Sequence, residues 1–229
     1  MRPARALLRL LAVQALAGAE PVTGSAYLSA DTYSTILRSM PIPTVDVLIF
    51  THGLDRTLLF NRTARPVQHI MYSLGGRVLH NEPLRDAAMR KLRQELPRVS
   101  DMVRTEDLVP GGVVEEIFED SAIPGVNSHC VNNVFGYVLP VDFKAESLLN
   151  AIGDRQHSMA AWMAVDDESL HPFMKRKVMR LLPVLHTRRA AGLLERLDGA
   201  RQPFRPAKGV GGRRRRRVPG TTRAVDALR

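Results

Sequence analysis

The sequence has one cysteine, Cys130, among its 229 residues. One thiol cannot form an intrachain disulfide, and a lone cysteine is typical of a reducing compartment. The chain also lacks an apolar run of the roughly 18 to 20 residues that a membrane-spanning helix requires. The sequence therefore predicts neither a disulfide-stapled fold nor a membrane span.

Acidic residues are scarce at both ends of the chain. The formal net charge is +10, of which residues 200–229 carry +9 and residues 1–20 carry +2, which leaves −1 for residues 21–199. The central stretch is long enough for one hydrophobic core. We expect one domain over residues 27–190, between an N-terminal segment (1–26) and a basic tail (191–229).

The N-terminal segment has the composition of a targeting signal. Arg2, Arg5 and Arg9 are separated by apolar residues, and no acidic residue precedes Glu20. A basic, acid-poor, amphipathic segment is typical of mitochondrial import, whereas Arg9 interrupts the apolar stretch that a secretory signal needs. We expect a mitochondrial location. A segment that is retained, in a cytoplasmic protein, is the alternative.

The tail is rich in arginine, glycine and proline, a composition that cannot bury a core and predicts disorder. Its charge could bind RNA phosphates or another anionic surface. A solvated tail without a partner is an equally weighted alternative. The candidate contact residues are the arginine run Arg213, Arg214, Arg215, Arg216 and Arg217.

Residues 75–97 carry the most informative pattern, GGRVLHNEPLRDAAMRKLRQELP. Glu82 follows Gly76 by six residues, Arg90 follows eight later, and Glu95 follows five beyond that. Glycine allows a sharp turn and close approach of a backbone carbonyl to a cation. The Asn-Glu-Pro triplet is a strong helix start. The pattern predicts a loop that leads into a helix and carries oxygen ligands suited to Mg²⁺.

This segment resembles the Nudix box, G-x5-E-x7-R-E-x-x-E-E-x-G. Lys91 and Gln94 replace glutamates of the usual box, and Pro97 replaces its last glycine. One branch, the GDP-mannose mannosyl hydrolases, also lacks those glutamates and keeps the equivalent of Glu95. The chain most resembles that branch.

The resemblance covers about residues 28–162. SMPIPTVDVLIF from Ser39 resembles the first strand of the family, and FNRTARPVQ from Phe60 resembles its R-T-x-R-P-A-Q segment. DRQHS from Asp154 matches its Gln-His pair. The family fold implied is an α/β/α sandwich around a mixed sheet, and the family also implies a homodimer.

The resemblance implies a metal site and a base. Mg²⁺ is the expected cofactor, held by the Gly75 carbonyl, Glu95 and Gln156, which are all oxygen donors. His157 is expected to activate water for attack on the anomeric carbon of a nucleotide sugar, as a neutral imidazole can. Because Lys91 lies four residues before Glu95, an ion pair between them would compete with the cation.

The substrate-binding set implied by the family consists of Arg62, Arg77, Asp46 and Cys130. Arginine forks fit phosphate oxygens in pairs, so Arg62 and Arg77 are assigned to the diphosphate leaving group. Arg62 and Asp46 also join His157 in the expected catalytic set. Asp46 lies within an apolar strand, where a structural ion pair is an equal alternative. Cys130 stands where the family has a catalytic tyrosine.

Three further residues have expected roles. Arg90 is expected to brace Glu82, and both Arg65 and Arg62 could instead be solvated hairpin charges. Glu116 replaces a family histidine that contacts the substrate, so a possible donor becomes an acceptor. Together with Cys130, this change predicts a shifted substrate choice.

Sequence patterns also predict the elements. Helices are expected at residues 31–38, after the loop of the box, and at 145–152 and 172–182; strands are expected at 45–50, 58–61, 112–118, 131–139 and 161–165. The last helix carries apolar residues at helical spacing that are expected in the core: Met174, Val178, Leu181 and Leu185.

Two functions remain open. The first is a Mg²⁺-dependent hydrolase of a nucleoside-diphosphate sugar, similar to GDP-mannose mannosyl hydrolase. The second is a Nudix-fold binding or scaffold protein with weak or no turnover, associated with organellar RNA through its tail. Gly75, Glu95, Gln156 and His157 favour the first, whereas Lys91, Cys130 and the tail favour the second.

Overall fold

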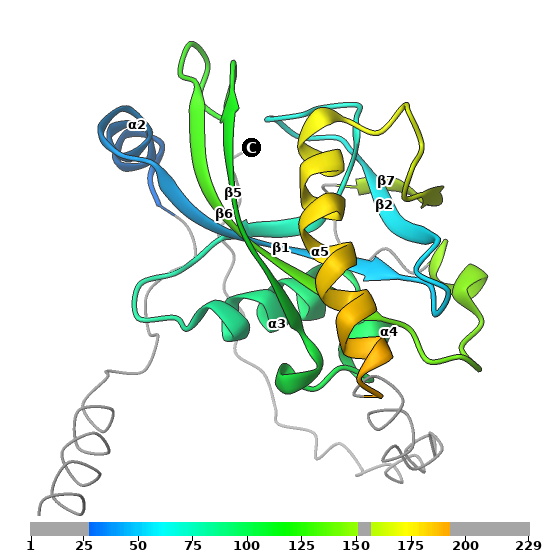
Figure 1. The fold of residues 1–229 in the computed structure, drawn as a ribbon. Helices are drawn as coiled ribbons and strands as arrows, with labels where there is room; N and C mark the ends of the chain where they lie inside the picture. The colour runs from blue at the N-terminus through cyan, green and yellow to red at the C-terminus, as the bar shows by residue number, and fades with distance from the viewer. Residues whose placement is uncertain (1–27, 151–156, 193–229) are drawn as a thin grey trace, which may run out of the picture.

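The computed structural model describes residues 28–150 and 157–192 (Figure 1). The N-terminal segment, the arginine-rich tail and Gln156 lie outside these residues. The described elements, in chain order, are α2 (Ala30–Ser39), β1 (Ile42–Phe50), β2 (Arg56–Arg62), β3 (Met71–Tyr72), β4 (Leu74–Arg77), α3 (Leu84–Glu95), α4 (Pro97–Ser100), η1 (Thr105–Asp107), β5 (Val109–Phe118), β6 (Ser128–Val138), η2 (Ala145–Leu148), β7 (His157–Ala164) and α5 (Pro172–Ala190).

The described strands form one mixed sheet of seven strands. Five of them follow the order β3-β2-β1-β6-β5, and the other two, β4 and β7, pair with β1 and β2. β1 and β6 pair in parallel, whereas the other pairs are antiparallel. One edge of β1 is shared, because β4 pairs with its first half and β2 with its last residues. β7 pairs with β2 on the other side. The first half of β1 therefore lies directly beside the glycine-rich β4.

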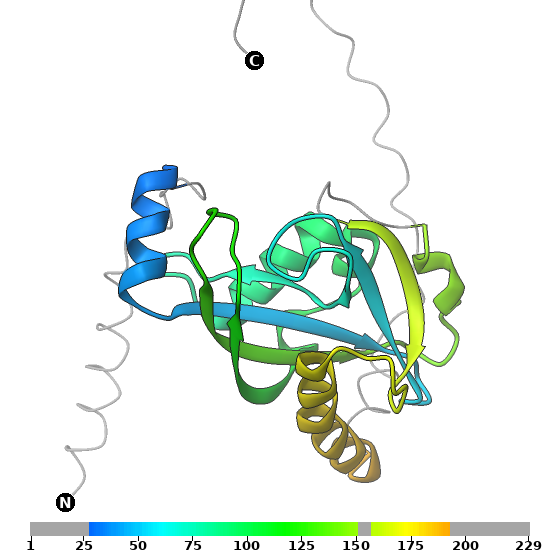
Figure 2. The same cartoon turned by 90° about the horizontal axis from the view of Figure 1, so that it is seen from above.

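Helices cover both faces of the sheet. Side chains alternate along a strand, so Val45 and Val47 of β1 join the core cluster that includes α3, whereas Leu48 and Phe50 join the cluster that includes α5. Figure 2 shows the sheet between α3, in green, and α5, in yellow. The expected α/β/α fold with a mixed sheet is confirmed.

The loop before α3 turns as the sequence pattern predicted. Asn81 has a φ of 59°, a left-handed conformation that asparagine tolerates better than most residues. Pro83 precedes the first helical residue and is the N-cap. Ala87, Ala88 and Leu92 are fully buried. Small residues at this contact let α3 approach the sheet closely, which brings the end of the helix near β4.

The terminal helix is longer than residues 172–182. The expected core residues Met174, Val178, Leu181 and Leu185 are all buried. Pro183 lacks the N–H that would bond within the helix, yet α5 continues to Ala190. Leu185 lies one turn after Leu181 and is fully buried in the same cluster, so packing keeps the chain helical past the proline.

Other boundaries also differ from the prediction. The helix expected over residues 145–152 is wrong within the described residues, where Ala145–Leu148 is a single 3₁₀ turn. β7 begins at His157, four residues earlier than expected, because it pairs with β2 from Arg62 to Arg56. None of the described helices is both long and apolar enough to cross a membrane.

Candidate functional site

A pocket of about 350 Å³ lies over the first half of β1. Its walls come from α2, the end of β2 and the loop after it, β3, β4, α3, β5 and β6. The expected residues Asp46, Arg62, Gly75, Arg77 and Cys130 line it. The charged side chains on its walls are Asp46, Arg62, Arg65, Arg77, Lys91 and Glu116.

The three arginines of the pocket differ in their side-chain contacts. Arg62 ends β2, and its guanidinium makes no hydrogen bond or ion pair with any residue that the structure describes; its Nε is buried. Arg65 Nε lies 3.5 Å from Asp120 Oδ2 at an exposed site. The Arg77 guanidinium lies 5.9 Å from the centre of the Tyr33 ring. Arg62 is thus ready to bind an anion.

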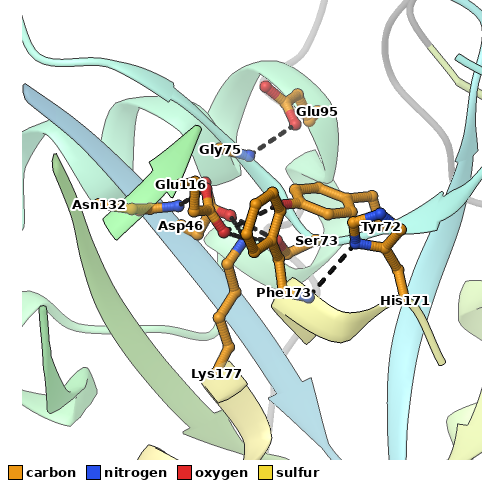
Figure 3. A network of polar contacts seen from close by, with 10 residues as sticks. All are labelled: Asp46, Tyr72, Ser73, Gly75, Glu95, Glu116, Asn132, His171, Phe173 and Lys177. Carbon is orange, nitrogen blue, oxygen red and sulfur yellow. Dashed lines mark hydrogen bonds and ion pairs between the residues drawn. The ribbon is translucent and has the colours of Figure 1, made fainter. Parts of the chain in front are cut away.

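Two buried carboxylates and a buried lysine form the base of this region (Figure 3). Lys177 extends from α5 and is fully buried. Its Nζ lies 2.7 Å from Glu116 Oε1 and also forms an ion pair with Asp46 Oδ2. Ser73 Oγ donates to Asp46 Oδ2 at 2.5 Å. Buried charges require such partners, so this cluster is a structural ion-pair network.

Glu116 is held from both sides. The Tyr72 hydroxyl donates to its Oε1 at 2.8 Å, and Asn132 Nδ2 donates to its Oε2 at 2.8 Å. Burial, followed by the nearby Glu116 charge, raises the pKa of Tyr72 well above its usual range. Tyr72 therefore stays protonated, as a donor to Glu116 must.

The network bears on the two alternatives for Asp46. The structural ion pair is present, with Lys177 as its partner. The same residue lines the pocket, so its expected catalytic and substrate-binding roles stay predictions. Glu116 likewise has both oxygens engaged while it lines the pocket.

The loop of the box is fixed by Glu82 and Arg90, as expected. Arg90 Nε donates to Glu82 Oε1 at 2.6 Å, and Nη2 donates to Oε2 at 2.8 Å. Nη2 also donates to the Arg77 carbonyl at 3.0 Å, and the Leu79 N–H donates to Glu82 at 2.9 Å. Burial opposes the charge of Glu82, but these hydrogen bonds outweigh it and lower its pKa. The brace therefore positions the end of β4, including Arg77.

Glu95 has a lysine where a metal ion was expected. Lys91 Nζ forms an ion pair with Glu95 Oε1, and the Gly75 N–H donates to Glu95 Oε2 at 3.3 Å (Figure 3). The expected ion pair at i, i+4 is confirmed. The part of the chain that the structure describes contains no cluster of three or more His, Cys, Asp or Glu side chains able to hold a metal. Among the described residues, Glu95, the one carboxylate of the expected magnesium site, is thus already paired with a cation.

Position 75 has no room for a side chain larger than that of glycine. A Cβ built on it would lie 2.0 Å from Asp46 Oδ1 and 2.4 Å from the Val45 carbonyl oxygen. Both distances are far below van der Waals contact. The glycine lets β4 pack against Asp46 while its N–H reaches Glu95.

His157 is buried at the start of β7, where it pairs with Arg62 of β2. Its ring centre is 5.4 Å from that of Phe60. It is not among the residues that line the pocket. Because Gln156 lies outside the described residues, the expected ligand has no described position. The role of His157 as a base stays a prediction.

Cys130 lines the pocket from β6, and its Sγ lies 3.5 Å from Ser128 Oγ. Burial raises the pKa of this thiol. It is therefore a small, neutral wall residue at neutral pH. The adjacent His129 points elsewhere, since its Nε2 lies 2.9 Å from Glu115 Oε1 at an exposed site.

Sequence reasoning missed Lys177. The residue follows Met174 by three positions and precedes Leu181 by four, so it lies on the buried stripe of α5. A lysine on an apolar helix stripe needs a buried acidic partner. Asp46, an acid within an apolar strand, was the complementary signal.

No protein-family model and no curated protein matches the chain. Similar solved structures include the Nudix domain of Shewanella oneidensis NrtR complexed with ADP ribose, which is 16% identical over 69% of this chain and 99% of that chain, with a TM-score of 0.47. A MutT Nudix hydrolase from Burkholderia pseudomallei is 20% identical over 62% and 99%, with a TM-score of 0.43. A C. elegans Ap4A hydrolase is 15% identical over 64% and 98%, with a TM-score of 0.44. The fold assignment rests on the sheet order and the helix layers described above.

Proposed function

We propose that this chain is a Nudix-type protein whose pocket binds a nucleoside-diphosphate sugar through its diphosphate. The observation that supports this proposal is that Arg62, Arg77 and Lys91 line one pocket. The buried Nε of the Arg62 side chain has no hydrogen-bonding partner among the described residues. A guanidinium offers paired donors that fit phosphate oxygens.

The size and polarity of the pocket support the same ligand class. Its volume of about 350 Å³ lies near the lower end of the range for small-molecule sites, roughly 300–1,000 Å³. Asp46 and Glu116 line the same pocket, and their carboxylate oxygens can accept hydrogen bonds in addition to those they already make. Acceptors suit sugar hydroxyls, whereas the arginines suit phosphate.

The proposed activity is hydrolysis of the bound nucleotide sugar. In this scheme water attacks the anomeric carbon and the bond to the diphosphate oxygen breaks. His157, which does not line the pocket but pairs with the pocket residue Arg62 at the start of β7, accepts the proton from water. Arg62 and Arg77 stabilise the charge of the leaving diphosphate. None of these steps involves Mg²⁺, because Glu95 is already paired with Lys91.

The second candidate is a protein that binds the same ligand without appreciable turnover. The Lys91–Glu95 ion pair favours this second candidate, because Glu95 is the carboxylate that was expected to bind the metal. The homodimer, the mitochondrial location and RNA binding by the tail remain proposals from the sequence.

Calorimetric titration with GDP, ADP, UDP and their sugars tests the binding proposal. Arg62→Met and Arg77→Met should each weaken binding about 10- to 100-fold, the equivalent of a lost charge-assisted hydrogen bond. Arg38→Met, at an exposed site on α2, is the matched control and should change nothing. Equal affinities in all four proteins would contradict the proposal.

Product analysis separates the two candidates. Turnover of a nucleotide sugar in labelled water should place the oxygen label in the free sugar, and His157→Ala should slow the reaction by about 10²- to 10⁴-fold. Label in the phosphate would contradict the proposed bond cleavage. Tight binding without products would establish the binding protein instead.

A further inference from the structure

Lys91 is the less deeply buried partner of its ion pair. Its side chain is 13% exposed, whereas that of Glu95 is 1% exposed. Lys91 is also among the residues that line the pocket, and Glu95 is not. A ligand in the pocket can therefore contact Lys91, whereas Glu95 is not part of the pocket wall.

The lysine is held in this position. A Cβ on Gly76 would lie 3.0 Å from Lys91 Cε, so the stem of the lysine packs against the bare backbone of β4. The Gly75 N–H fixes the other oxygen of Glu95 at 3.3 Å. Both partners are thus ordered before any ligand arrives, which lowers the entropic cost of binding.

We propose that the Lys91 ammonium supplies the positive charge at Glu95 that a divalent cation would otherwise supply, so that the pocket binds diphosphate without metal. This inference rests on the proposed function of the pocket. A divalent cation at Glu95 would lie beside a like charge, and the described residues provide no cluster of acidic or imidazole ligands to hold it. Arg62 and Arg77 then complete a phosphate site made of side chains alone.

The test is calorimetric titration of the full-length protein with GDP, in EDTA and in Mg²⁺. Wild type should bind with the same affinity in both. Lys91→Gln should weaken GDP binding in EDTA about 10- to 100-fold. Mg²⁺ should restore part of the lost affinity, because Glu95 is no longer paired with a lysine and can bind the metal. Arg93→Gln, at an exposed position on the same helix, is the control and should behave as wild type.

A second set of variants keeps the test decisive if Lys91→Gln does not fold. Lys91→Arg retains the charge and should retain metal-free binding. Lys91→Gln combined with Glu95→Gln removes both buried charges and should bind weakly with or without Mg²⁺. When Mn²⁺ alone is titrated into the wild-type protein and monitored by electron paramagnetic resonance, no binding at Glu95 should be seen.

The outcomes separate this inference from the proposed function. Wild-type binding of GDP only in Mg²⁺ would overturn the inference and leave the pocket assignment intact. Affinity of Lys91→Gln in EDTA equal to that of Arg93→Gln would also overturn it. Absence of binding to GDP, ADP and UDP in both buffers would overturn the pocket assignment itself.

Discussion

Lys177 Nζ lies 2.7 Å from Glu116 Oε1 in the interior of the protein, and the same ammonium pairs with Asp46. The three residues come from α5, β5 and β1, so this contact ties the terminal helix to the centre of the sheet. Lys177 also lies 4.0 Å from the centre of the Tyr72 ring. The base of the pocket therefore depends on correct docking of α5.

Replacement of Lys177 by methionine should strongly destabilise the fold. Two carboxylates would lose their shared cation, and removal of one partner of a buried pair costs about 3–5 kcal/mol. Urea unfolding of Lys177→Met should show this loss, whereas Arg180→Met, at an exposed position on the same helix, should be nearly neutral. Equal stabilities of the two variants would mean that the network is not important for folding.

A methyl group at Gly75 should disturb both the fold and the pocket. The added Cβ of Gly75→Ala would collide with the Asp46 carboxylate and the Val45 carbonyl. Thermal unfolding should show a clear loss, and GDP binding should weaken. Gly53→Ala is the control, because its new Cβ would come within 3.0 Å only of the flexible Asp55 side chain. A Gly75→Ala protein as stable as this control would show that β4 can shift freely.

The brace between Glu82 and Arg90 should make stability depend on pH. The folded-state pKa of Glu82 is lowered, so its contribution is full above the unfolded pKa of about 4.3 and is lost as pH falls through the folded value. Glu82→Gln should lower the free energy of unfolding by about 1–3 kcal/mol at neutral pH. Urea titrations over a pH series should show this difference shrink in acid. A difference independent of pH would argue against the charged brace.

The local contacts could be predicted because they lie within one segment. The Glu82–Arg90 brace and the Lys91–Glu95 pair follow from spacing along a single loop and helix. The core stripe of α5 was predicted for the same reason. Each needs only the helical period and the chemistry of opposite charges.

The partners of Lys177 could not be predicted, since they lie on separate strands. Asp46 and Glu116 approach each other only after β6 inserts between β1 and β5. The start of β7 also depends on pairing between strands. Because Arg62 of β2 pairs with His157, β7 begins there rather than at residue 161. Sequence patterns identify that Asp46 needs a partner but do not choose among distant lysines.

Deletion of residues 201–229 should separate the tail from the pocket. The tail carries most of the net charge of the chain, and no residue within it belongs to the proposed site. GDP binding should be unchanged in the truncated protein. Binding to RNA should fall sharply, with a smaller salt dependence, because fewer counterions are released. Unchanged RNA affinity and salt slope would place RNA recognition on the folded domain.

We propose that Arg62 and Arg77 hold a diphosphate in the pocket that Lys91 also lines. A crystal structure of the full chain grown with GDP in EDTA tests it most directly. That structure should place phosphate oxygens within hydrogen-bonding distance of the Arg62 and Arg77 guanidinium groups and the Lys91 ammonium, without a metal ion. GDP bound away from β4, or phosphates held through a metal on Glu95, would contradict it.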